Sequence, residues 1–78
     1  MNADLNVDSS IEVFVQVYRV SVKKSEGGYN MVRPEAWVNY PLSERVRLLS
    51  EGCVEFIDSR GTRIPVREAL KDLARLAD

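Results

Sequence analysis

Three arginines near the C-terminal end of the chain, Arg60, Arg63 and Arg67, have the residue type and the spacing to bind an anion. They fall in a predicted turn, in the strand after it and in the first turn of a predicted helix. Guanidinium groups beside the free N–H groups of a helix start can hold a phosphate or a carboxylate. The sequence therefore predicts an anion-binding patch. The alternative is that these arginines are solvated and paired with carboxylates such as Asp58 and Glu68.

Side chains that could transfer protons or hold a metal are few. The chain has no histidine and one cysteine, Cys53, which falls in an apolar strand pattern and is expected to be a small buried hydrophobic residue. Glu55 and Asp58 are close in sequence, but a strand and a turn direct their side chains apart. No metal-ligand spacing and no phosphate-binding glycine pattern is present. The sequence predicts no enzyme, no cofactor, no metal and no small-molecule substrate.

Three aromatic residues, Tyr29, Trp37 and Tyr40, cluster around the prolines Pro34 and Pro41, where loops often expose aromatic rings. Tyrosine and tryptophan are favoured anchors of protein interfaces. We therefore predict that these rings bind a partner protein. The alternative is that they cap the core and direct only their polar tips to solvent.

The composition is that of an ordinary globular protein, with 45% hydrophobic and 29% charged residues in a chain of 78. A domain of this size buries only about 60% of the surface of its unfolded chain, so an obligate partner or a homodimer is expected. A net charge of −1 argues against a broad nucleic-acid footprint, although it leaves room for a local basic patch. Without an apolar run near the ~20 residues of a membrane span, or a signal peptide, we expect a cytoplasmic protein of a bacterium or phage that does not bind membranes.

The first half of the chain predicts a β-hairpin. Residues 11–22 alternate as a long strand that is apolar on both faces, so helices on both sides or a second subunit must cover it. A bulge or bend is expected at residues 16–19. Residues 23–28 form a turn with two glycines, and residues 29–33 return as the second strand. Residues 34–40 fit either a helical turn that begins with proline or a short strand.

The second half predicts a helix, a second hairpin and a final helix. In residues 41–52, Ser43 is the expected N-cap, and Leu42, Val46 and Leu49 have the spacing of a buried stripe. Gly61 lies where a bulged hairpin loop needs a left-handed residue. The final helix begins at Pro65. Its predicted buried stripe is Val66, Ala69, Leu70, Leu73, Ala74 and Ala77, and its predicted outer face is Arg67, Glu68, Lys71, Asp72 and Arg75.

These elements occur in the order ββαββα. We predict an α+β fold: a small single domain over residues 11–78, with a hairpin-built antiparallel sheet and two helices packed on it. Residues 1–10 are predicted to be a flexible arm. Residues 32–37 and 66–70 are weakly alike, each a few residues after a glycine turn, which leaves open an internal repeat with a pseudo-symmetric sheet.

Residues 58–65 (DSRGTRIP) and the REAL sequence after them resemble the swapped-hairpin, AbrB-type bacterial regulators. In that family a polar and basic turn with glycine, a strand that ends in Ile-Pro and a helix form a dimeric DNA-binding hairpin. This chain departs from the pattern in two ways: the spacing from Gly61 to Pro65 is one residue short, and no strands follow the helix. The resemblance implies DNA binding by the arginines of this segment.

Taken together, the near-neutral charge, the missing catalytic groups and the surplus of apolar residues favour a non-catalytic regulatory or adaptor protein. It is expected to act by protein–protein interaction through Tyr29, Trp37 and Tyr40, with a homodimer as one form of that interaction. The alternative is a small dimeric DNA-binding transcriptional regulator that uses the arginine patch.

Overall fold

The computed structural model describes residues 15–76, so the predicted arm and the predicted start of the first strand, residues 11–14, lie outside the described range. The elements, in chain order, are β2 (Arg19–Lys23), β3 (Tyr29–Val32), α2 (Pro34–Val38), α3 (Leu42–Ser50), β4 (Val54–Ile57), β5 (Arg63–Ile64), α4 (Val66–Leu73) and a 3₁₀ turn, η1 (Ala74–Leu76). The predicted α+β class is confirmed. The segment for which the sequence left helix and strand open forms α2, so one helix is added to the predicted order.

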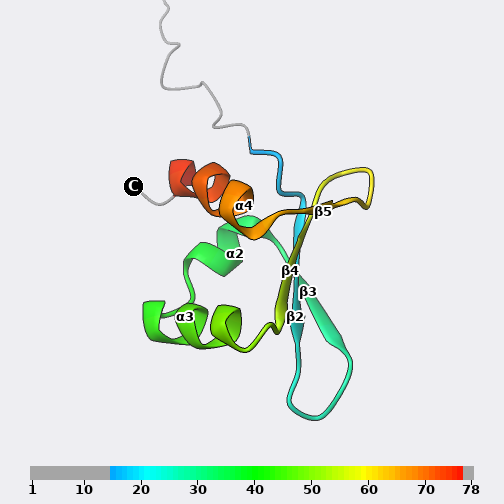
Figure 1. The fold of residues 1–78 in the computed structure, drawn as a ribbon, viewed down its shortest axis with the longest axis vertical. Helices are drawn as coiled ribbons and strands as arrows, with labels where there is room; N and C mark the ends of the chain where they lie inside the picture. The colour runs from blue at the N-terminus through cyan, green and yellow to red at the C-terminus, as the bar shows by residue number, and fades with distance from the viewer. Residues whose placement is uncertain (1–14, 77–78) are drawn as a thin grey trace, which may run out of the picture.

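The strands form one antiparallel sheet in the order β3-β2-β4-β5, and all three α-helices lie on one side of it (Figure 1). The register places Val20 of β2 beside Val32 of β3 and Phe56 of β4. Ile64 of β5 continues this row beside Phe56. These residues share the helix-covered face, which explains why β2 and β4 are apolar at alternate positions.

The opposite face of the sheet, called here the open face, has no helix over it in the described part of the chain. Because Ser21 pairs with Met31 and with Glu55, these three residues lie on this face together. The sequence required helices or a second subunit over each apolar face, and the structure supplies helices for one face only.

A β-bulge at the start of β2 decides which residues face the core. The register pairs Arg19 with Ile57, yet the N–H of the preceding Tyr18 also donates to the carbonyl of Ile57, at 2.8 Å. Two residues of one strand therefore oppose one residue of the other, as predicted for residues 16–19. The bulge shifts the alternation by one position, so Val17 and Val20 are both buried. Tyr18 and Arg19 share the other side, where the guanidinium lies 4.3 Å from the ring centroid.

Both hairpins use the same turn, and a left-handed glycine makes each one possible. Gly27 has φ +105° and Gly61 has φ +84°, values that side chains with a Cβ rarely adopt. In the first turn the Lys24 N–H donates to the Gly28 carbonyl, and the Lys24 carbonyl accepts from the Gly27 N–H. In the second turn the Asp58 N–H donates to the Thr62 carbonyl, and the Asp58 carbonyl accepts from the Gly61 N–H. The two hairpin loops therefore share the same pattern of backbone hydrogen bonds.

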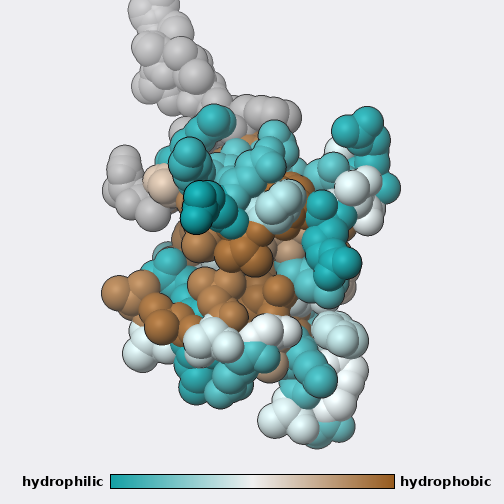
Figure 2. Space-filling view, in the orientation of Figure 1, coloured by the Kyte–Doolittle hydropathy of each residue, from teal (hydrophilic) through white to brown (hydrophobic). Residues whose placement is uncertain are grey.

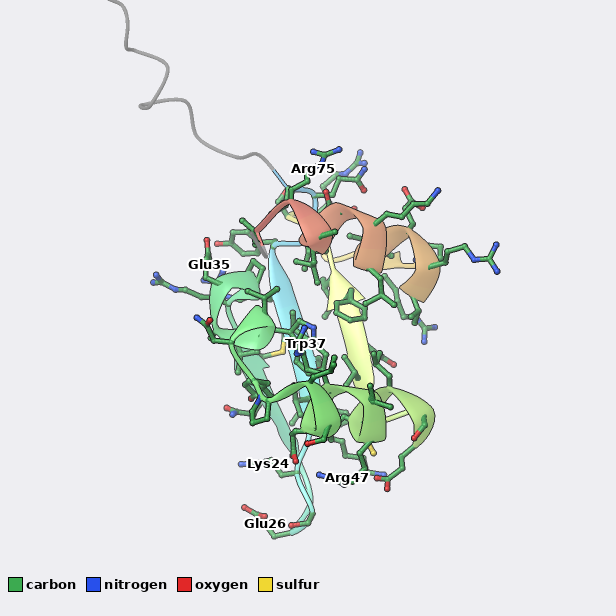
Figure 3. All side chains as sticks on the ribbon, turned by 90° about the vertical axis from the view of Figure 1, so that its left-hand side faces the viewer. Lys24, Glu26, Glu35, Trp37, Arg47 and Arg75 are labelled. Atoms are coloured by element: carbon green, nitrogen blue, oxygen red, sulfur yellow. The ribbon has the colours of Figure 1, made fainter. Side chains whose placement is uncertain are left out.

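The core forms where α2 fills the space between the sheet and the other helices. Trp37 is 1% exposed and lies between α3 and α4 in Figure 3. Its ring meets Phe56 edge-on at 5.9 Å between centroids and Tyr40 at 5.2 Å. The buried apolar residues are Val17, Val20, Val22, Trp37, Leu48, Val54, Phe56, Ile64, Ala69 and Leu73.

The predicted buried stripe of α3 is wrong at two of its three positions. Leu48 is the buried residue of this helix and Leu49 is half-buried, whereas Leu42 is 66% and Val46 is 56% exposed. Successive residues of an α-helix point about 100° apart, so a helix that directs Leu48 toward the core turns the other two away. The helix also begins one residue before the predicted cap, with Pro41 rather than Ser43 at the N-cap position.

The final helix is likewise rotated relative to its prediction. Ala69 and Leu73 are buried as expected, but Val66, Leu70 and Ala74 are exposed, and Asp72, which was predicted to face solvent, is buried. Ala77 lies outside the described residues. The reason is a polar contact that apolar spacing does not encode: the Asp72 carboxylate accepts a hydrogen bond from the backbone N–H of Val17, at 3.0 Å.

Candidate functional site

The three aromatic residues that the sequence groups together lie on different sides of the sheet. Trp37 is buried in the core, which agrees with the alternative that these aromatic residues pack on the core and not with a binding role for this ring. Tyr40 is half-buried beside it, and its carbonyl accepts a hydrogen bond from the Arg45 Nε at 3.0 Å. Tyr29 is 60% exposed, but it pairs with Lys23 and so belongs to the open face. Of the three, Tyr29 alone is exposed.

The three arginines are exposed but do not converge. Arg63 points to the open face, where its guanidinium lies 3.2 Å from the Glu55 carboxylate. Arg67 belongs to α4, which covers the other side of the sheet. Arg60 lies in the turn between β4 and β5, next to Asp58. The sheet therefore separates Arg63 from Arg67, and the three do not form one continuous face.

In the turn that contains Arg60, the side-chain carboxylate of Asp58 already accepts the backbone N–H groups that could otherwise bind an anion. Asp58 Oδ1 accepts hydrogen bonds from the backbone N–H groups of Arg60 and Thr62, both at 2.9 Å. The pKa of Asp58 is lowered chiefly by the Thr62 bond, with smaller contributions from the backbone and charge of Arg60. A negative charge is thus already in place beside the guanidinium, which weakens this turn as a site for a second anion.

Both α3 and α4 carry large apolar side chains that are exposed. Leu42 and Val46 lie one turn apart on α3, and Val66 and Leu70 lie one turn apart on α4. Figure 2 shows apolar surface over the region between these helices, bordered by hydrophilic surface above and below. We call these four residues the α3–α4 surface. Contiguous apolar patches rimmed by polar residues mark interaction sites on soluble proteins.

A hollow continues this surface toward the edge of the sheet. It has a volume of about 400 Å³ and is lined by Val54, Phe56, Ile64 and Val66 together with Gly52 and Pro65. It forms because β5 pairs with Phe56 and Ile57, and within residues 15–76 no strand continues along the outer edge of β4 at Val54. Val66 belongs both to this hollow and to the α3–α4 surface, so the two are adjacent.

The groups that could support catalysis or metal binding are dispersed over the described residues. Residues 15–76 contain no cluster of three or more metal-ligating side chains. The Cys53 thiol is half-buried and donates a hydrogen bond to the Glu51 carbonyl, 3.8 Å away. None of the helices in this range has the length and apolar character needed to cross a bilayer.

Sequence reasoning missed the α3–α4 surface because it assigned the same apolar residues to the core. One signal could have revealed them: α3 carries Leu42, Val46, Leu48 and Leu49, more apolar positions than one side of a nine-residue helix can bury. A surplus of this kind indicates that some of the residues face outward.

The comparisons with known proteins add no relative: no family model, no curated protein and no solved structure matches this chain.

Proposed function

We propose that this chain is a non-catalytic protein-interaction module whose α3–α4 surface docks a partner protein. A single observation supports this proposal: four large apolar side chains that their spacing assigns to a core, Leu42 and Val46 of α3 and Val66 and Leu70 of α4, are exposed. Burying them against a partner would contribute roughly 25 cal/mol for each Å² of apolar area removed from water. Acting as a regulator or adaptor requires no more chemistry than this.

The proposed partner offers an apolar surface of its own, framed by polar groups. Arg67 and Lys71 directly follow Val66 and Leu70 on α4 and place positive charge beside this surface. Such a polar rim selects orientation and partner more than it adds affinity. The anchoring energy therefore comes from the leucines and valines.

The experiment is affinity capture from the source cells, with the wild-type chain and two charged variants of the surface, Val46→Asp and Leu70→Asp. A protein retained in stoichiometric amount is then purified and titrated against each variant. We expect the affinity to fall about 30-fold or more in each variant, the loss expected for an interface anchor worth ~2 kcal/mol. Both positions are exposed, so circular dichroism should show both variants folded.

Tyr18→Asp is the matched control, because Tyr18 is an exposed apolar residue on the opposite side of the sheet. This variant should bind as the wild type does. Equal affinity of all four proteins, or the absence of any stoichiometric partner, would refute the proposal. Saturable binding to duplex DNA that weakens steeply with salt and is lost in Arg63→Ala would instead support the DNA-binding alternative.

A further inference from the structure

Among the residues that the structure describes, no strand pairs with the outer edge of β3. The Lys24 N–H donates to the Gly28 carbonyl at 2.9 Å, so this pair lies at a hydrogen-bonded position of the β2–β3 ladder. Such pairs recur at every second position of an antiparallel ladder, so Asn30 directs its N–H and C=O toward β2. Tyr29 and Met31 therefore direct theirs away from the sheet, at its edge.

Nothing on β3 discourages another strand from joining it. The strand reads YNMV, with no lysine, proline or bulge of the kind that protects natural sheet edges. On its open face Tyr29 is 60% and Met31 is 55% exposed. The edge thus offers both unpaired hydrogen-bonding groups and large apolar side chains.

We propose that the occupant of this edge is a second copy of the chain, with β3 paired antiparallel to β3 about a two-fold axis at Asn30. In this register Tyr29 lies opposite the partner's Met31, and Met31 lies opposite the partner's Tyr29. Both of these positions direct their backbone groups outward, so both pairs exchange hydrogen bonds. The strand is therefore complementary to itself, and the two sheets become one continuous sheet.

The charges at the two ends of β3 support a second copy as the occupant. The turn end carries Lys24 and Glu26, and the other end carries Arg33 and Glu35. Figure 3 shows Lys24 and Glu26 at one end and Glu35 toward the other. Antiparallel pairing brings opposite ends together, so Glu26 lies near the partner's Arg33 and Lys24 lies near the partner's Glu35. Lys24 extends over Gly28 toward this edge, because its Cε lies 3.7 Å from where a Cβ of Gly28 would be.

Within one chain, these four charged side chains form no salt bridge among the described residues. Glu26 accepts only a hydrogen bond from the neighbouring Ser25, at 3.3 Å. The pairing therefore adds two oppositely charged contacts at each end of the strand.

This inference extends the proposed function, protein–protein contact, but it uses the edge of the sheet rather than the α3–α4 surface. A dimer built on β3 leaves both α3–α4 surfaces uncovered. Failure of the dimer would therefore leave the partner titration above unaffected, and failure of that titration would leave the dimer unaffected.

The first test is the mass of the purified full-length chain in solution, measured by light scattering across a range of concentrations. We expect a mass approaching twice the 8.9 kDa of one chain as concentration rises. Asn30→Lys places two like charges opposite each other at the axis and should return the mass to that of a single chain. Ser25→Lys, an exposed position in the turn, should leave the dimer intact. A wild-type chain that is monomeric at every concentration would overturn the proposal.

The second test fixes the register. On a Cys53→Ser background, Asn30→Cys brings two thiols together at the axis, in a pair whose Cα atoms are about 4.5 Å apart, within reach of a disulfide. We expect oxidation to cross-link this variant into a dimer, and to leave Ser25→Cys on the same background unlinked. A dimer that forms without cross-linking at Asn30, or that is dispersed by Val46→Asp, would show a different interface and would also overturn the proposal.

Discussion

Single residues determine how the final helix meets the sheet. Asp72 is the clearest case, because it is a buried carboxylate in a helix whose neighbouring charges are exposed. It accepts the Val17 N–H at 3.0 Å, and its other oxygen lies 3.9 Å from the Arg75 guanidinium. One side chain thus joins the C-terminal helix to the residue before the β-bulge. No periodicity of apolar residues could have predicted this contact.

Replacing this carboxylate should be costly. Asp72→Ala leaves the N–H of Val17 buried without an acceptor, a loss of about 1–3 kcal/mol. For a domain of this size each kcal/mol lowers the melting temperature by about 4–8 °C. Thermal unfolding followed by circular dichroism measures the change. Asp72→Asn, which keeps an oxygen acceptor, should lose less, and the exposed Glu68→Ala should change stability by no more than about 0.5 kcal/mol. Equal melting temperatures for Asp72→Ala and Glu68→Ala would contradict this account.

A second carboxylate should make stability depend on pH. The pKa of Asp58 in the folded chain is lowered by the Thr62 and Arg60 N–H groups, so the folded chain binds a proton less readily than the unfolded chain. The resulting stabilisation is present above the unfolded pKa of about 3.9 and is lost as the pH falls through the lower folded pKa.

Asp58→Asn keeps the turn acceptor but does not titrate, so its free energy of unfolding should fall less than that of the wild type as the pH is lowered below about 4. Urea unfolding at successive pH values measures the two slopes. Parallel curves would show that the turn carboxylate contributes nothing to acid sensitivity.

At the scale of elements, the sequence predicted the hairpins better than it predicted the faces of the helices. Glycine and polar residues mark each turn unambiguously, and alternation in β4 directs Val54 and Phe56 to the same face. The helices are short, and two turns of apolar residues fit several rotations almost equally well. Trp37 and Asp72 decide between those rotations through tertiary contacts.

Two leucines of α3 provide a matched test of the observed rotation. Leu48→Ala removes a buried side chain and should cost about 2–5 kcal/mol. Leu42→Ala removes the same atoms from an exposed position of the same helix and should stay within about 0.5 kcal/mol. Chemical denaturation of the two variants compares them directly. The stripe predicted from spacing would require Leu42→Ala to cost as much as Leu48→Ala.

At the scale of the whole molecule, the candidate surfaces arise from what the fold leaves uncovered. Helices cover one face of the sheet, so Tyr29 and Met31 remain exposed at an edge. Trp37 lies between α3 and α4, and four apolar residues of these helices remain exposed: Leu42, Val46, Val66 and Leu70. The sequence indicated an apolar surplus and a role in protein binding. It included Trp37 among the binding residues, although Trp37 is buried in the core. Its burial depends on packing between segments that are distant in the sequence, and the local sequence does not show that packing.

The central proposal is that the α3–α4 surface docks a partner protein, and amide hydrogen exchange of the chain with and without the captured partner tests it most directly. We expect slower exchange in the complex along α3 and α4, residues 42–50 and 66–73, with the turn between β4 and β5 unchanged. Protection confined to that turn around Arg60, or no change on either helix, would contradict the proposal.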